Sequence, residues 1–335
     1  MTTLMTMTQT IPAAVQVTAY FPDFISWIDR PEKTTRTYVN NLKQFACWMA
    51  DNNIETPTRD DIISYRRDLE ARGCKPTTVK AYLQTVKAFF RWTAAAGIYP
   101  DVASNVHTPK LTAEHRKDAL EKTDVLAIES SIRTNADAHL QAASEAPKDT
   151  AGRMQRATEQ DKRLYALYLL AVNAGLRTIE ISRADVGDLI QRGGQSYLRV
   201  QGKGHAEKDV LKGLAPEVAD AIREYLAARS DAWNKDSPLF CATGNRSGGK
   251  RLATTTISTM LKQAMQAAGY DDDRLTAHSL RHTAGTACMQ MTGDLYATQS
   301  YMRHSSPNTT EIYIHVDDQR RDAQTAADLY SYYHN

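Results

Sequence analysis

The feature that most constrains the fold is the way proline and glycine divide the first third of the sequence into helical segments. Over residues 15–96 the apolar side chains recur at helical spacing, and Pro31, Pro57 and residues 73–76 interrupt them. Such punctuation predicts roughly four helices. We therefore expect a small all-helical domain, with its boundaries at residues 14–107.

The last helical segment, which begins near residue 75, has the clearest pattern. Thr77 and Thr78 are expected to cap its first turn. One face is apolar, and a basic stripe formed by Lys80, Lys87 and Arg91 lies beside it. The stripe suits either a solvated flank or a surface laid against DNA phosphates, so these three residues are our candidate DNA contacts.

A second, larger domain is expected after a linker. Residues 108–118 show little periodicity and read as the linker, so the second domain covers residues 119–335. Within it, residues 135–160 are polar and alanine-rich, and we expect an insertion or mobile loop there. A strong helix should follow at residues 162–174 and end at Gly175, a residue that favours the left-handed cap.

The middle of the second domain has the pattern of a small sheet. Short β-prone runs between Asp188 and Leu211 are separated by Gly193-Gly194 and by Gly202-Lys203-Gly204, which predicts antiparallel strands with tight turns. The segments that follow return to helix. The expected fold class is therefore mainly α with a small antiparallel β-sheet (α+β).

Composition excludes several classes of protein. No apolar run reaches the length of about 18 residues that a membrane span needs, and 41 basic against 39 acidic residues give a net charge of +2. Any DNA-binding surface must therefore be local. The four cysteines, Cys47, Cys74, Cys241 and Cys288, form no CxxC pair, which argues against a disulfide framework and a zinc site. We expect a cytoplasmic protein with no membrane partner.

Four motifs rich in phosphate-binding side chains follow one another along the second domain. They are Ala174-Gly175-Leu176-Arg177-Thr178-Ile179-Glu180, Gly202-Lys203-Gly204, His278-Ser279-Leu280-Arg281-His282, and the run from His304 to Tyr313. Together they closely resemble the tyrosine recombinase, or phage integrase, family. The resemblance in the catalytic part covers about residues 120–316, and the segment from Lys75 to Trp92 resembles the family's core-binding domain.

The residue types in these motifs suit attack on a phosphodiester. The phosphate gains charge on its non-bridging oxygens, and the planar guanidinium groups of Arg177 and Arg281 offer paired donors for that charge. His278 and His304 can donate further hydrogen bonds. Tyrosine, with a pKa of about 10, is a poor nucleophile at neutral pH, so Tyr313 needs a base, and His278 can accept its proton.

Two further residues complete the predicted catalytic set. Lys203, at the tip of the expected hairpin, is the candidate general acid that protonates the departing 5′ oxygen. Glu180 lies three residues after Arg177 on the same helical face and can orient Arg177 or a histidine from behind.

No metal or other cofactor is expected. The sequence has neither a Walker loop nor the grouped carboxylates of two-metal nucleases, and a phosphotyrosyl bond would conserve the energy for rejoining. His278 and His282 stand four residues apart, as metal ligands often do. However, no glutamate follows His278 and no third ligand is evident.

The resemblance implies a site-specific DNA recombinase whose helical and catalytic domains form a clamp on DNA. It implies a 3′-phosphotyrosyl intermediate, a Holliday junction and a homotetramer on two double-stranded DNA sites, with an accessory directionality factor as an optional partner. Nucleoid association would accompany DNA binding. The enlarged catalytic domain favours integration or excision of a mobile element. Xer-like chromosome or plasmid dimer resolution, a type IB topoisomerase and a non-catalytic DNA-binding regulator are the alternatives.

Two features near the C-terminus stay open. Arg303 stands where the family usually has glycine, so the path of the turn before His304 is not predicted. A possible helical face suits docking either on an adjacent subunit or on its own domain; it is formed by Val316, Arg320, Ala323, Ala327 and Tyr330.

Overall fold

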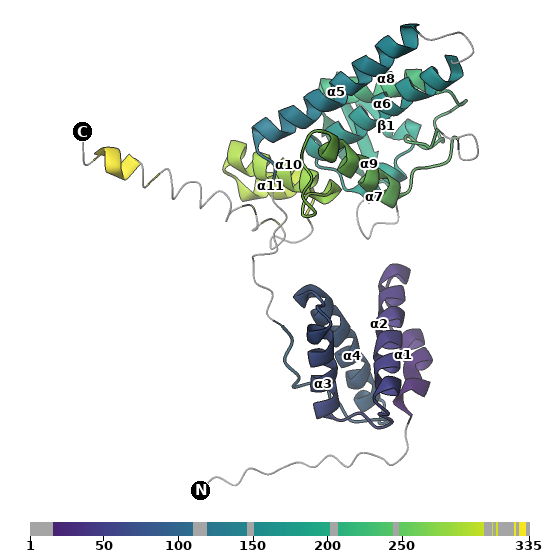
Figure 1. Ribbon diagram of the computed structural model, residues 1–335, viewed down its shortest axis with the longest axis vertical. Helices are drawn as coiled ribbons and strands as arrows, with labels where there is room; N and C mark the ends of the chain where they lie inside the picture. Colours follow the sequence, from purple (N-terminus) through teal and green to yellow (C-terminus); the bar gives the residue numbers. More distant parts are fainter. Residues whose placement is uncertain are drawn as a thin grey trace. The chain divides into compact units, whose positions relative to one another are not determined.

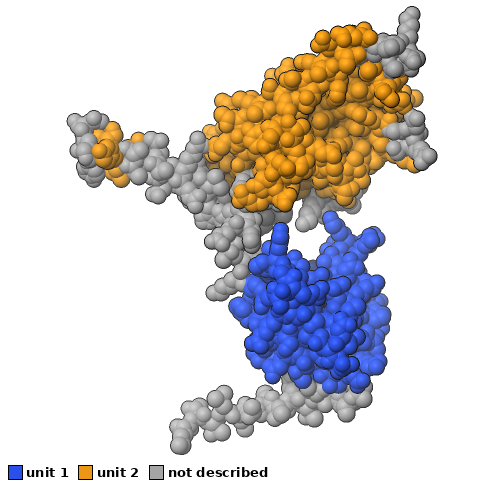
Figure 2. Space-filling model, in the orientation of Figure 1, with its two compact units in different colours: residues 1–115 blue, residues 116–335 orange. Residues whose placement is uncertain are grey.

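The computed structural model describes most of the chain (Figure 1). The described residues are 16–109, 119–145, 151–201, 207–243, 248–304, 310, 313, 325 and 328–332. The chain divides into two compact units, residues 1–115 and residues 116–335 (Figure 2). Each unit has an apolar core of its own.

The first unit is a bundle of helices. Its elements are η1 (Val17–Tyr20), α1 (Phe21–Trp27), α2 (Glu32–Asp51), α3 (Arg59–Ala71) and α4 (Pro76–Ala95). Pro31 lies between α1 and α2, Pro57 between α2 and α3, and Gly73 between α3 and α4. The predicted division of this region into helices is confirmed.

The N-termini of α3 and α4 are capped differently. Thr58 caps α3 through a capping box, in which the Thr58 backbone N–H donates to Asp61 Oδ2 over 2.7 Å. In α4 the N-cap residue is Lys75, which makes no side-chain cap. The expected threonine cap is therefore wrong. Pro76 begins α4, so Thr77 and Thr78 already lie inside its first turn.

Aromatic rings and one buried polar bond hold α2, α3 and α4 together. The ring of Phe45 lies 5.0 Å from that of Tyr65 and 6.2 Å from that of Phe90, measured between centroids. Asn41 Nδ2 donates to Thr85 Oγ1 over 2.9 Å between α2 and α4. A satisfied buried pair of this kind fixes how the two helices are aligned.

The second unit combines helices with a small sheet. Its elements are α5 (Lys122–Glu145), α6 (Ala151–Val172), α7 (Thr178–Arg183), η4 (Val186–Asp188), β1 (Leu189–Arg192), β2 (Gln195–Val200), β3 (Val210–Leu214), α8 (Pro216–Ala228), α9 (Thr254–Ala267), α10 (Ala277–Thr292) and α11 (Leu295–Met302). Within this unit α6 packs against α5, α8 and α10. Among the described residues, no helix has both the length and the apolar character that crossing a membrane requires.

The sheet is antiparallel in the order β1-β2-β3. Arg192 pairs with Gln195, and the two-residue turn between them is Gly193-Gly194, with φ of +57° and +78°. Such a turn requires positive φ at both central residues, which glycine adopts without strain. Val200 pairs with Val210 at the other hairpin, whose tip falls outside the described residues. The expected fold class, mainly α with a small antiparallel sheet, is confirmed.

The expectation of a mobile loop at residues 135–160 is wrong for the described part of that stretch, whereas an insertion there stays a prediction. α5 continues to Glu145 and α6 begins at Ala151, so helix occupies most of this stretch. Both helices project beyond the core there, and the described side chains of residues 133–145 are mostly exposed, Leu140 among them. A helix with little buried surface shows no apolar stripe, while alanine and the charged residues still favour helix.

Four buried residues form a small apolar cluster separate from the main core of the second unit. They are Ala284 and Met289 of α10, Met302 of α11, and Tyr313. The cluster places the predicted nucleophile beside α10 and α11. The main core instead lies around α6, where Leu167, Tyr168 and Leu170 are fully buried.

Candidate active site

α10 presents three of the relevant residues on one face. His278, Arg281 and Gly285 are spaced by three and four residues and therefore share that face. His278 is exposed in the first turn, whereas Arg281 is only 2% exposed. The two terminal nitrogens of Arg281 donate to the backbone carbonyls of Gly175 and Met302. These bonds fix the guanidinium, and burial lowers its pKa to about 10 with help from nearby Arg177.

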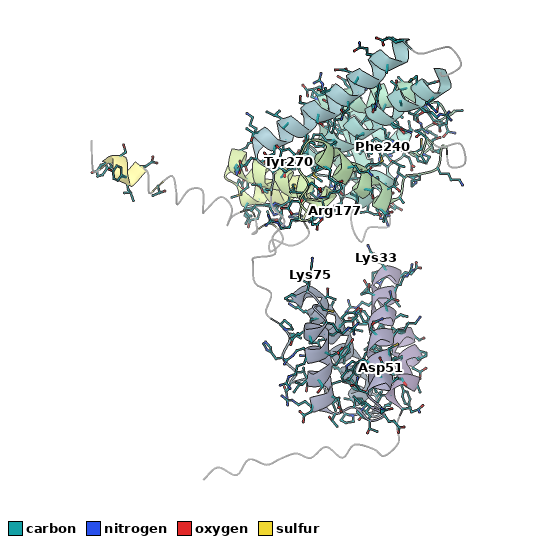
Figure 3. The ribbon with its side chains drawn as sticks, viewed as in Figure 1. Lys33, Asp51, Lys75, Arg177, Phe240 and Tyr270 are labelled. Atoms are coloured by element: carbon teal, nitrogen blue, oxygen red, sulfur yellow. The ribbon has the colours of Figure 1, made fainter. Side chains whose placement is uncertain are left out.

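Arg177 and Glu180 hold one another at the start of α7. Arg177, labelled in Figure 3, is the N-cap residue of this helix. Its backbone N–H donates to Glu180 Oε2 over 2.8 Å, and its NH1 donates to Glu180 Oε1 over 2.9 Å. The Glu180 side chain is fully buried, while that of Arg177 keeps 24% of its surface exposed. The predicted contact between this carboxylate and the arginine is therefore present.

Tyr313 lies against α10 in the same chain. A Cβ atom on Gly285 would come within 2.6 Å of the Tyr313 hydroxyl and 2.3 Å of its Cζ, so only glycine leaves room for this ring. The ring also meets His282 edge-on, with centroids 4.9 Å apart, and stacks on His304 at 6.0 Å. Burial raises the pKa of Tyr313, and Arg281 and Arg177 partly offset that rise.

His304 follows Arg303, the residue that ends α11, and is neutral at physiological pH. Its Nδ1 lies 2.9 Å from the hydroxyl of Thr310, which is fully buried. Burial lowers the pKa of His304 to about 4, and the positive charges of Arg281 and Arg177 contribute. When Nδ1 accepts from Thr310, the proton lies on Nε2, which is then free to donate.

Arg303 has an unusual backbone and a buried partner. Its φ and ψ are both 52°, which is the left-handed region, and it ends α11. A non-glycine residue in this conformation costs about 1 kcal/mol or more. Arg303 NH2 donates to Glu180 Oε2 over 2.6 Å, so two arginines share one carboxylate. The turn that the sequence left open is therefore a left-handed one, which explains why glycine suits the position.

Lys212 is a buried cation that sequence reasoning missed. It lies on β3, is 5% exposed, and its Nζ donates to the carbonyl of Tyr301 over 2.8 Å. Burial lowers its pKa to about 7, and Arg303 and Arg281 lower it further. The signal was available in strand parity. Every second residue of β3 faces inward, so Lys212 shares the inward face with Val210 and Leu214, while Leu211 points outward.

The structure brings together most, but not all, of the predicted site residues. Arg177, Glu180, Arg281, His304 and Tyr313 gather around α7, α10 and the end of α11. His278 is close enough to His304 to affect its pKa. Lys203 falls outside the described residues, and so do four of the five predicted C-terminal face residues. Tyr330, the fifth of them, is 67% exposed.

The candidate DNA contacts of the helical unit differ in their surroundings. Arg91 is exposed, Lys80 is half-buried, and Lys87 Nζ donates to the carbonyl of Ser104 over 3.5 Å. Two exposed lysines at the N-terminal ends of α2 and α4, Lys33 and Lys75, lie at one end of this unit (Figure 3). Helix N-termini favour phosphate, so this end is a second basic feature of the unit.

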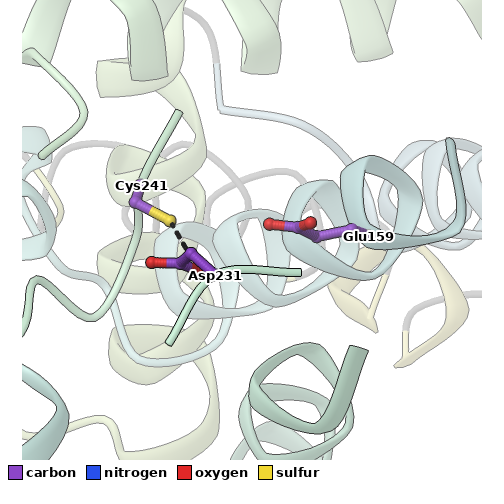
Figure 4. Close-up of side chains that lie close together, drawn as sticks. All are labelled: Glu159, Asp231 and Cys241. Carbon is purple, nitrogen blue, oxygen red and sulfur yellow. Dashed lines mark hydrogen bonds between the residues drawn. The ribbon is translucent and has the colours of Figure 1, made fainter. Parts of the chain in front are cut away.

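A separate cluster has the ligand types that a metal ion can use. Glu159, Asp231 and Cys241 place one ligand atom each within 4.8 Å of one another (Figure 4). Arg229 already pairs with Asp231 through two hydrogen bonds of 2.8 and 2.6 Å, and Ser230 donates to Glu159 over 2.7 Å. The carboxylates are therefore occupied, and burial raises the pKa of the Cys241 thiol, which disfavours the thiolate that metals bind.

Comparison with protein families decides the classification. Residues 147–320 match the model of the phage integrase family, and residues 19–97 match that of its N-terminal SAM-like domain. This chain is a tyrosine recombinase of the phage integrase family. Tyrosine recombinases cut and rejoin DNA. The recombinase is 27% identical over 314 residues to the tyrosine recombinase XerC of Corynebacterium efficiens, covering 92% of this chain and 90% of that relative.

Further relatives agree with this assignment. The tyrosine recombinase XerD of Caulobacter vibrioides is 30% identical over 261 residues, covering 77% of this chain and 76% of the relative. The fold of the recombinase is similar to that of the XerH site-specific recombinase bound to a palindromic difH substrate, with a TM-score of 0.68, 20% identity and coverage of 89% and 80%. It is also similar to a lambda integrase tetramer bound to a Holliday junction, with a TM-score of 0.64, 16% identity and coverage of 90% and 78%.

Proposed function

We propose that this recombinase acts at specific DNA sites by attack of Tyr313 on a phosphate held by Arg177 and Arg281. The observation that carries the proposal is the position of the Tyr313 phenol. It lies on α10 at Gly285, one turn beyond Arg281 and on the same helical face. A phosphate bound by the two guanidinium groups would thus lie near the nucleophile of the same chain.

The remaining residues take the roles that their surroundings support. The raised pKa of Tyr313 keeps the phenol protonated at neutral pH, so attack needs a base. His278, exposed on the same face of α10, can accept that proton. Neutral His304 donates from Nε2 to a non-bridging oxygen, and Lys203 protonates the leaving 5′ oxygen. The product is a 3′-phosphotyrosyl ester that a 5′ hydroxyl from a second site can reopen.

Replacing Tyr313 with phenylalanine tests the chemistry. On a nicked suicide duplex, wild-type protein is expected to accumulate a covalent complex, while Tyr313→Phe binds the same DNA without forming one. DNA for the assay can be found by sequencing fragments trapped covalently on the wild-type protein. A covalent complex in Tyr313→Phe would assign the nucleophile to another residue.

The general acid has its own test. Lys203→Ala is expected to slow cleavage of an ordinary substrate far more than cleavage of a substrate with a 5′-sulfur leaving group, because a thiolate leaves without a proton. Equal slowing of both substrates would remove Lys203 from this role.

Contacts outside the cleavage site are also proposed. The helical unit would meet DNA phosphates through Lys80, Lys87 and Arg91, with Lys33 and Lys75 as a second basic group, and would complete a clamp with the catalytic unit. A lambda integrase tetramer of similar fold bound to a Holliday junction supports a homotetramer on two sites. Exposed Tyr330 and Tyr332 are suited to subunit contacts.

The biological role has two candidates. Relatives named XerC and XerD, aligned over 92% and 77% of the chain, favour an Xer-like role in dimer resolution. Integration or excision of a mobile element is the second candidate, since the long α5 and α6 enlarge the catalytic unit. Trapped DNA from a chromosomal or plasmid resolution site would support the first, and trapped element ends the second. Relaxation of supercoiled DNA without joint products would instead indicate topoisomerase activity.

A further inference from the structure

The turn between α11 and His304 has a left-handed residue at Arg303. The backbone N–H groups of Arg303 and His304 turn back to the carbonyls of Ser300 and Gln299, over 3.1 Å each. Gln299 Nε2 in turn donates to the His304 carbonyl over 3.1 Å. The left-handed residue therefore sets the direction in which the chain leaves α11 and enters the segment carrying His304.

The side chain of Arg303 reaches from this turn to α7. Its NH2 lies 2.6 Å from Glu180 Oε2, the same oxygen that accepts from the Arg177 backbone. The side chains of Arg303 and Glu180 are 14% and 0% exposed. One carboxylate thus joins two segments that are far apart in sequence, and both segments supply residues of the cleavage site.

This arrangement is unfavourable by itself. A glycine would adopt the backbone conformation of Arg303 without strain. Arg303 also adds a buried positive charge near Arg177, Arg281 and Lys212, and burial lowers its pKa. A strained and charged residue persists at such a position only where its surroundings compensate, and this is typical of functional sites. Here the compensation is the ion pair with Glu180.

We propose that Arg303 is a positioning residue for DNA cleavage, which acts by fixing Glu180 and thereby Arg177 and the turn that carries His304. The inference rests on the proposed function. Without Arg303, Glu180 keeps its contacts with Arg177, but the carboxylate no longer ties Arg177 to the turn of His304. That turn then keeps its link to the other phosphate-binding arginine, the bond from Arg281 to the Met302 carbonyl. Misplacing such groups by about 1 Å can lower a catalytic rate by roughly two orders of magnitude.

A different role for Arg303 makes different predictions. Among the described residues, its Nε and NH1 atoms are buried without a hydrogen-bond partner. A guanidinium with spare donors can in principle contact the phosphate directly. If Arg303 contacts the phosphate directly, removing it would weaken DNA binding and lower the salt dependence of the binding constant by about one unit of slope. If Arg303 is a positioning residue, its removal would change neither quantity.

The test compares Arg303→Gly, Arg303→Asn and Arg303→Lys in full-length protein. Glycine and asparagine both tolerate the left-handed backbone, so the turn can form without the charge. The cleavage rate is measured in single turnover on a nicked duplex carrying the sequence recovered from wild-type covalent complexes. We expect both neutral variants to cleave about 10- to 100-fold more slowly, with DNA affinity within about threefold of wild type, and lysine to recover part of the rate.

A matched control isolates the backbone effect. Asn53, at the end of α2 in the helical unit, is the other non-glycine residue with positive φ in the described part of the chain, at +55°. It is exposed and lies outside the cleavage site. Asn53→Gly makes the same kind of backbone change without altering the charge near Glu180, and is expected to cleave at the wild-type rate.

A double-mutant cycle tests whether Arg303 acts through Glu180. Glu180→Gln alone is expected to reproduce the slow cleavage of Arg303→Gly, and it keeps the test decisive if a variant at Arg303 unfolds. Adding Arg303→Gly to Glu180→Gln should then slow cleavage by less than about threefold, because the contact is already lost. If Arg303→Gly slows cleavage as much in the Glu180→Gln protein as in wild type, Arg303 does not act through Glu180. A smaller salt dependence of DNA binding in Arg303→Gly would show that Arg303 contacts the phosphate directly. Either result would overturn the proposal.

The outcomes separate this inference from the proposed function. If wild-type protein forms no covalent complex that depends on Tyr313, the proposed function fails. If wild type forms it and Arg303→Gly forms it equally fast, the proposed function stands and the positioning role of Arg303 is wrong.

Discussion

Two largely buried ionic clusters of the catalytic unit differ in charge balance. The first, here called the cleavage cluster, contains Arg177, Arg281, Arg303 and Lys212, and Glu180 is its carboxylate among the described residues. The second, the balanced cluster, contains Arg163 and Arg229 together with Glu159 and Asp231; Arg229 pairs with Asp231, and Glu159 acts on Arg163 through its charge. Buried charges ordinarily need compensation. The proposed binding of a DNA phosphate would offset the excess of positive charge in the cleavage cluster.

The largest expected effect comes from removing a guanidinium of the cleavage cluster. Arg281→Ala should lower the single-turnover cleavage rate by about 1000-fold, because a preorganised donor to the phosphate is lost. DNA affinity should fall modestly, and its salt dependence should decrease by about one unit of slope, because one phosphate contact among many is lost. Quench-flow cleavage assays and DNA-binding titrations measure the two quantities. Cleavage within tenfold of wild type would remove Arg281 from the phosphate clamp.

Removing an arginine of the balanced cluster should lower the stability of the fold and leave the cleavage rate unchanged. Arg229→Met leaves Asp231 without its bidentate partner and removes the bond to the Pro238 carbonyl, so we expect the free energy of unfolding to fall by about 3 kcal/mol. The cleavage rate of the folded fraction should equal that of wild type. Arg72→Met, which breaks an exposed pair with Asp68 in the helical unit, is the control and should cost about 0.2–1 kcal/mol. A slower cleavage rate in folded Arg229→Met would show that the balanced cluster also serves cleavage and not only the stability of the fold.

Removing Lys212 should stabilise the fold. Its pKa is about 7 in the folded protein and 10.5 ordinarily, so the unfolded chain binds the proton more tightly. The resulting cost is fully present below pH 7, shrinks as pH rises to 10.5 and is absent above. Lys212→Met should therefore raise the free energy of unfolding by about 1–2 kcal/mol at pH 7, and by less at pH 9.

Urea unfolding at both pH values measures the effect of Lys212→Met. Exposed Lys235 provides the control, because Lys235→Met should change stability little at either pH. A loss of stability in Lys212→Met at pH 7 would mean that the contact with the Tyr301 carbonyl outweighs the cost of burial.

The smallest expected effect is stabilisation by a simple anion. Sulfate at its dissociation constant would add about 0.4 kcal/mol to the stability of wild-type protein by occupying the cleavage cluster. Sulfate also stabilises proteins nonspecifically, so the informative quantity is the difference in melting temperature between wild type and Arg281→Ala at equal ionic strength. Equal shifts in the two proteins would argue against an anion site at the cleavage cluster.

Sequence patterns predicted the helical unit and the sheet because both depend on local signals. Pro31, Pro57 and Gly73 mark real helix boundaries, and Gly193-Gly194 forms the turn between β1 and β2. The error at residues 135–160 arose where helices extend beyond the core and lose their apolar stripe. Periodicity reports burial, so it identifies a projecting helix poorly.

The site was predictable in its residue types but not in its internal contacts. Arg177, Arg281, His304 and Tyr313 were named from motif order, and the contact of Glu180 with Arg177 follows from their spacing along one helix. The contact of Glu180 with Arg303 joins residues 123 positions apart, so no local pattern contains it. Lys212 was missed although its inward position follows from the alternation of Val210, Lys212 and Leu214 along β3, because a lysine is ordinarily expected on the exposed face of a strand.

Tyr313, the proposed nucleophile, belongs to the small apolar cluster with Ala284, Met289 and Met302 and not to the core around α6. Separating this cluster exposes few apolar side chains, at about 1.5–3 kcal/mol for each large one, which is far less than global unfolding requires. Amide hydrogens of α11 should accordingly exchange with solvent sooner than those of α6. Reversible local opening would let Tyr313 change its position between rounds of strand exchange while the core around α6 stays folded.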